Sequence, residues 1–84
     1  MTSEDVVAQL RLRGFRPGTA QELYALGARY PRLQREITII ALGSKSADSR
    51  VPGLFEDVGG NRGAGLWYWS NDWSPEFWFL AFRD

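Results

Sequence analysis

The sequence predicts an α+β fold in which two N-terminal helices pack on one face of an antiparallel sheet of about four strands. Helix-capping signals are confined to residues 1–31, whereas runs of β-branched and aromatic residues, separated by turn residues, fill 36–84. The connections are short, which favours antiparallel neighbours. With 84 residues the chain has the length of a single domain, residues 1–84, with 1–31 as its helical part and 36–84 as its antiparallel sheet.

The first predicted helix begins at Thr2 or Ser3 and runs to about Arg13. A hydroxyl at its start can satisfy free backbone N–H groups, and the acidic residues that follow face the positive end of the helix dipole. Gly14 then supplies the left-handed conformation that commonly ends a helix.

The second predicted helix has the sharpest local signal in the chain. Thr19 and Glu22 have the spacing of a capping box, in which each side chain bonds the backbone N–H of the other residue. Pro31 ends this helix near Tyr30. The preceding segment, Arg16 to Gly18, is predicted to be a turn.

Four segments rich in β-branched or aromatic residues are predicted as strands: Glu36–Leu42, Arg50–Glu56, Leu66–Trp69 and Glu76–Arg83. Pro52 and Gly53 favour an edge position or a bulge for the second strand. The glycine-rich stretch Gly59–Gly65 is predicted to be a loop. The sequence order then predicts a meander, in which each strand pairs with the next.

Composition narrows the chemistry. The chain has no Cys and no His, so the usual zinc sites, a thiol nucleophile and an imidazole base are all missing, and we expect a non-enzymatic protein without a cofactor. An enzyme using carboxylates remains a third hypothesis, with Glu56, Asp57, Asp72 and Glu76 as the acid and base candidates.

Charge and hydropathy bear on partners and location. Ten basic and ten acidic residues cancel, which argues against a long nucleic acid as partner and leaves a nucleic-acid module as the fourth hypothesis. The acidic start is unlike a secretory signal, and no apolar run approaches the ~20 residues of a membrane helix. We therefore expect a cytoplasmic protein that does not bind membranes.

Aromatic residues are concentrated in the last third of the chain, where nine of the twelve follow residue 50. On both faces of the last two predicted strands the residues are apolar, more than helices on one face can cover. We expect a contact surface for a protein partner or a second copy, made of Trp67, Trp69, Trp73 and Trp78 and framed by Arg62, Glu56 and Asp57. Alternatively, the rings complete a small core.

The arginines suggest a second hypothesis for the binding site. Arg11, Arg29, Arg32 and Arg35 could line a pocket for a small nucleotide, with phosphate held by guanidinium groups and the base stacked on Trp or Tyr. Alternatively, Arg11 and Arg29 are solvated charges that stabilise the negative ends of their helices.

Three short motifs carry a resemblance. The string Arg16–Leu23 (RPGTAQEL), Ala41–Ser44 (ALGS) and Phe79–Arg83 (FLAFR) is similar to a set of small bacterial and phage-type proteins that share an RPxTxxEL, ALGS and FLAxR pattern. The resemblance implies a small accessory protein of mobile-element type that acts by stoichiometric binding. Counter-defence, through sequestration of a host immune protein or of its nucleotide messenger, is one such role.

Overall fold

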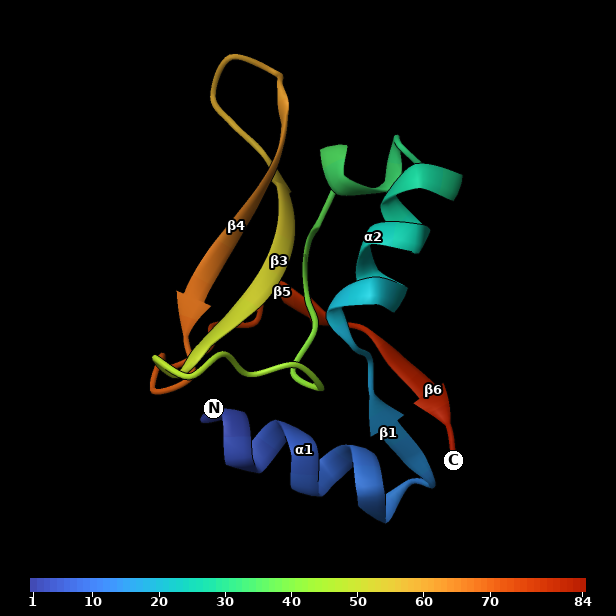
Figure 1. Ribbon diagram of the computed structural model, residues 1–84, viewed down its shortest axis with the longest axis vertical. Coiled ribbons are helices and arrows are strands. Elements are labelled where there is room, and N and C mark those ends of the chain that lie inside the picture. Colours follow the sequence, from blue (N-terminus) through green and yellow to red (C-terminus); the bar gives the residue numbers. More distant parts are fainter.

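The computed structural model describes residues 1–84 and shows an α+β fold (Figure 1). The elements in chain order are α1 (Ser3–Leu12), β1 (Phe15–Pro17), α2 (Ala20–Arg29), the 3₁₀ helix η1 (Leu33–Arg35), β2 (Thr38–Ile40), β3 (Arg50–Glu56), β4 (Arg62–Tyr68), β5 (Phe77–Phe79) and β6 (Ala81–Arg83). A four-stranded sheet has the order β4-β3-β2-β5, and β1 and β6 form a separate two-stranded sheet.

Both helices begin at capping boxes. Thr2 accepts from the N–H of Asp5 in α1, and Thr19 accepts from the N–H of Glu22 in α2; in both boxes the acidic side chain accepts from the N–H of the threonine. The sequence signal for α2 is therefore confirmed. The capping box of α1 shows that Thr2, not Ser3, is its cap.

The two helices lie on opposite faces of the four-stranded sheet, so the prediction that both cover one face is wrong. Ile39 and Ile40 are consecutive in β2 and point to opposite faces. Ile40 packs in a cluster with Val6 of α1, whereas Ile39 packs in a second cluster with Leu23 of α2. Figure 1 shows α1 below the sheet and α2 beside it. We call the two surfaces the α1 face and the α2 face.

The predicted meander is also wrong. β5 runs parallel to β2, with Ile39 opposite Trp78, and β2 is antiparallel to β3. The last predicted strand divides at Leu80, whose N–H donates to the Ile40 carbonyl and whose carbonyl accepts from Gly18. Beyond this point β6 pairs with β1, which includes Arg16 and Pro17 of the predicted turn.

Two predictions about β3 and β4 need correction. β4 begins at Arg62, so its first half lies in the stretch that was predicted to be a loop. β3 is a central strand although it contains Pro52. The Pro52 carbonyl still accepts from the N–H of Ala41, just beyond the end of β2. Because proline has no N–H, the β2–β3 ladder loses only its last hydrogen bond.

Candidate functional site

One concave surface lies on the α2 face, between α2 and β4. Two hollows follow one another there. One, of about 230 Å³, is lined by Ala20, Tyr24, Ser44, Lys45, Ser46, Arg50, Pro52 and Leu66. The other, of about 330 Å³, is lined by Gly27, Ala28, Gln34, Leu54, Arg62, Gly63 and Ala64. We call the two together the α2–β4 groove.

Strand pairing and helix periodicity build this groove. Its floor is β3, where Pro52 and Leu54 point to the same face and are both buried. One wall is a helical stripe of mostly small residues, spaced by three or four positions along α2: Ala20, Tyr24, Gly27 and Ala28. The other wall is the alternate residues of β4, namely Arg62, Ala64 and Leu66.

Large apolar side chains are exposed at one end of the groove. Tyr24 is 48% exposed, and Leu66 and Tyr68 are each 56% exposed. Tyr68 lies directly opposite Arg50 in the β3–β4 ladder. The Arg50 guanidinium lies 4.6 Å from the centroid of the Tyr68 ring and donates to the phenol oxygen at 2.8 Å. These contacts fix the Tyr68 ring while leaving much of its surface accessible.

The rim of this end is basic. The Lys45 ammonium lies 4.8 Å from the centroid of the Trp69 ring and makes no ion pair. Arg50 forms an ion pair with Asp48, at 3.1 Å between Nε and Oδ2. A partner that covers Leu66 with an apolar group would therefore meet positive charge at the edge of the contact.

The four predicted tryptophans do not form one surface. Trp73 is buried, 4% exposed, in the α1-face core, with edge-on contacts to Phe77 and Phe79. Trp67 and Trp69 are half-buried against the same core. Trp78 alone is exposed, at 59%, and its strand register places it across the sheet from β4. Trp73 is thus excluded from a contact surface, because no partner can reach it.

A buried hydrogen-bond chain explains the position of Trp73. Its indole N–H donates to the Ser3 hydroxyl at 2.8 Å, and that hydroxyl donates to the Trp69 carbonyl at 2.7 Å. Ser3 has no exposed surface. The Trp69 indole is also fixed, since its N–H is shared between the two carboxylate oxygens of Glu4. These indoles join α1 to the sheet.

The residues predicted to frame the contact are Glu56, Asp57 and Arg62. They lie at the end of the β3–β4 hairpin opposite to Arg50 and Tyr68. Glu56 and Arg62 face each other across β3 and β4, and Glu56 pairs with Arg35 at 3.6 Å. Asp57 organises the turn: its Oδ1 accepts from the N–H groups of Asn61 and Gly59, each at 2.9 Å, and these bonds lower the pKa of its carboxyl. Arg62 belongs to the groove, whereas Asp57 has a structural role.

The predicted arginine pocket contains only two of its four arginines. Arg29 and Arg32 line a cleft of about 460 Å³ together with Tyr30, Pro31, Leu33 and Glu36. Arg35 lines a neighbouring hollow and pairs with Glu56. Arg11 lies in α1, 4.0 Å from a carboxylate oxygen of Asp84.

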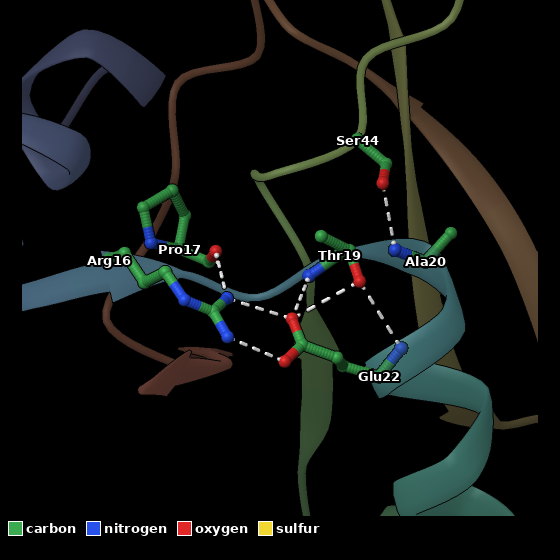
Figure 2. A network of polar contacts seen from close by, with 6 residues as sticks. All are labelled: Arg16, Pro17, Thr19, Ala20, Glu22 and Ser44. Carbon is green, nitrogen blue, oxygen red and sulfur yellow. Dashed lines mark hydrogen bonds and ion pairs between the residues drawn. The ribbon is translucent and has the colours of Figure 1, made fainter. Parts of the chain in front are cut away.

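Two of the three motifs that carry the resemblance, RPGTAQEL and ALGS, meet where β1, α2 and the segment after β2 lie together (Figure 2). The third motif is joined to the first by the hydrogen bond from the Gly18 N–H to the Leu80 carbonyl. Arg16 donates to both carboxylate oxygens of Glu22, at 2.9 and 2.7 Å, and the N–H of Ala20 donates to the Ser44 hydroxyl at 2.8 Å. The Arg16 hydrogen bonds, together with those from Thr19, lower the pKa of the Glu22 carboxyl to about 2 and raise that of the Arg16 guanidinium. Each of these polar contacts joins two groups of this chain, so the network stabilises the fold.

No three acidic side chains come together to form a group that could hold a metal ion. Neither helix has the length and apolar character needed to span a bilayer.

Sequence reasoning missed Tyr24, Leu66 and Tyr68 as site residues. One signal was present: in addition to the stripe that contains Leu23 and Leu26, α2 carries the stripe of small residues and Tyr24 that lines the groove. Two apolar stripes on one helix indicate two contact surfaces.

Comparison with known proteins found no match, whether among protein-family models, curated proteins or solved structures.

Proposed function

We propose that this chain is a non-enzymatic binding protein that acts by stoichiometric protein–protein contact through the α2–β4 groove. The partner places an apolar side chain between Tyr24 and Leu66 and an acidic group near Lys45. This is the class of function expected from the aromatic content. The proposed contact surface, however, is the α2–β4 groove and not the set of tryptophans.

The observation that carries the proposal is the uncovered part of the α2 face. α2 packs over β2 and β3 through Leu23, Ile39 and Leu54, and no residue of β4 belongs to this buried cluster. Leu66 and Tyr68 are therefore exposed side by side on one face of an ordered strand. Contiguous apolar surface of this kind on a small domain is typical of a protein contact site.

A quantitative pull-down tests this proposal. The wild type is compared with Leu66→Glu and with Leu12→Glu, the matched control, because Leu12 is an 81% exposed leucine on α1, away from the groove. If Leu66 is a binding hot spot, the first change costs ~2 kcal/mol, about thirtyfold in Kd. A partner retained by wild type and Leu12→Glu but lost by Leu66→Glu supports the groove. Equal retention by both variants contradicts it.

A second candidate function is the binding of a small phosphorylated ligand, such as a nucleotide, in the cleft of Arg29, Tyr30 and Arg32. The observation that favours it is that neither arginine forms an ion pair within the chain, while the Arg29 guanidinium lies 5.7 Å from the centroid of the Tyr30 ring. Free guanidinium groups beside an aromatic ring suit phosphate and base together.

Thermal melting against a nucleotide panel tests this second function. A ligand at 100 times its Kd adds about 2.7 kcal/mol of stability. Arg32→Gln is expected to abolish the shift, whereas Arg11→Gln, in α1 and outside the cleft, retains it. If no nucleotide or inorganic phosphate raises the melting temperature of the wild type, this candidate is rejected.

A further inference from the structure

β4 is an open edge of the four-stranded sheet, and its backbone shows which groups are free. The N–H of Trp69 donates to the Ser49 carbonyl, and the N–H of Asp57 donates to the Asn61 carbonyl. In the β3–β4 register, residues with odd numbers therefore bond to β3. The N–H groups of Arg62, Ala64, Leu66 and Tyr68 point away from β3 and make no hydrogen bond within the chain.

This edge lacks the features that block strand pairing. Pairing between the edge strands of two molecules is commonly prevented by short length, proline, bulges or inward-pointing charges. β4 has seven residues in unbroken register with β3, no proline, and a charge only at Arg62. β5, at the opposite edge, has three residues. The unprotected edge is thus β4.

The strand is complementary to itself. It reads RGAGLWY, with small residues at positions 63–65 and large ones at 66–68. If two copies pair antiparallel with Gly65 on the twofold axis, residues 62 and 68 oppose each other, as do 64 and 66, so all four outward-pointing N–H groups of each copy face a carbonyl. One of these carbonyls, that of Tyr68, also accepts from the N–H of Asn71 in its own chain. Leu66 then lies beside Ala64 of the second copy, and Trp67 opposite its Gly63.

The same register also pairs charge with an aromatic ring. Arg62 has no ion pair or hydrogen bond within its own chain. In the paired strands it lies opposite Tyr68 of the second copy. The Arg50 guanidinium occupies one face of that ring, so the other is left for Arg62.

We infer that the occupant of the β4 edge is a second copy of this chain, which joins two four-stranded sheets into one continuous sheet across a twofold axis at Gly65. The two α2–β4 grooves then lie side by side on one face. This inference deepens the proposed function, since it gives the partner a doubled groove to bind.

A backbone substitution on the purified protein tests the pairing. Ala64→Pro removes one outward-pointing N–H per copy but no bond to β3, and Ala64→Thr, of similar size, keeps that N–H. The Kd of the dimer is measured by sedimentation equilibrium. We expect it to rise about tenfold or more for Ala64→Pro and to stay near the wild-type value for Ala64→Thr. A wild type that is monomeric at the highest attainable concentration overturns the inference.

Disulfide trapping reads the register directly, because the chain has no cysteine of its own. In the proposed pairing Gly65 lies opposite Gly65 of the second copy as a non-hydrogen-bonded pair. The two Cα atoms of such a pair are about 4.5 Å apart, a distance that suits a disulfide. The inference predicts that Gly65→Cys oxidises to a covalent dimer, while Ala64→Cys and Leu66→Cys do not. Dimers formed equally by all three, or only by one of the latter two, contradict this register.

The two tests separate this inference from the proposed function. Dimer formation is measured without any other protein, whereas the groove is tested by loss of a captured partner. If Ala64→Pro is monomeric and still retains the partner, the groove acts in a single copy. If the wild type forms the Gly65-centred dimer but Leu66→Glu retains the partner, the dimer stands and the groove does not.

Discussion

Arg16 and Glu22 form a bidentate ion pair that joins β1 to the first turn of α2, with Nη1–Oε1 and Nη2–Oε2 distances of 2.9 and 2.7 Å. The Glu22 carboxylate also accepts from the backbone N–H of Thr19, so one side chain both caps the helix and anchors the strand. Because β1 pairs with β6, the pair also helps to hold the C-terminal strand.

This ion pair predicts a dependence of stability on pH. The pKa of Glu22 is about 2 in the folded chain, below its usual value of about 4.3. A carboxyl with a lowered folded pKa stabilises the fold above its unfolded pKa, and that contribution is lost as the pH falls from about 5 to about 2. Urea unfolding at neutral and acidic pH is expected to show a smaller pH dependence for Glu22→Gln than for wild type.

The control for this prediction is Glu76→Gln, which changes an exposed carboxylate without an ion pair. Its stability is expected to follow the wild-type pH curve. An unchanged pH dependence in Glu22→Gln would show that the ion pair does not stabilise the fold.

Ser3→Ala is expected to destabilise the fold by about 1–3 kcal/mol, because it removes the partner of the buried Trp73 indole and one partner of the Trp69 carbonyl. Guanidinium unfolding followed by tryptophan fluorescence measures this. Ser74→Ala changes an exposed serine near the same indole and is expected to stay within about 0.5 kcal/mol of wild type. Equal stability of both variants would exclude the hydrogen-bond chain as a stabilising feature.

A pair of glycines facing each other across β3 and β4 provides a matched packing test. A Cβ at Gly53 would lie 2.5 Å from the Trp67 ring and 2.6 Å from Ile40, whereas one at Gly65 would lie 3.3 Å from the same ring. Gly53→Ala is therefore expected to cost about 1–3 kcal/mol. Gly65→Ala is expected to cost less, and the reverse order in thermal unfolding would contradict the packing described.

Features that depend on neighbouring residues could be predicted from the sequence. The capping box of Thr19 and Glu22 acts within four residues, so the start of α2 was predicted correctly. The bounds of β3 were also predicted, because β-branched and aromatic residues define it locally.

Features that depend on distant residues could not be predicted. Nothing near Leu80 marks a break in the strand, because the break results from its bonds to Gly18 and Ile40. Likewise, the burial of Trp73 depends on Ser3, seventy residues earlier. The sequence does contain a signal for helices on both faces of the sheet. Ile39 and Ile40 are adjacent apolar residues on a strand, so both faces must be covered.

Site-specific photocrosslinking tests most directly whether the α2–β4 groove is the binding surface. A benzophenone amino acid is introduced at Leu66, or at Leu12 as the control, and the protein is irradiated with the partner identified by pull-down. We expect a covalent adduct with the partner from residue 66 and none from residue 12. Adducts from residue 12 alone, or in equal yield from both positions, would contradict it.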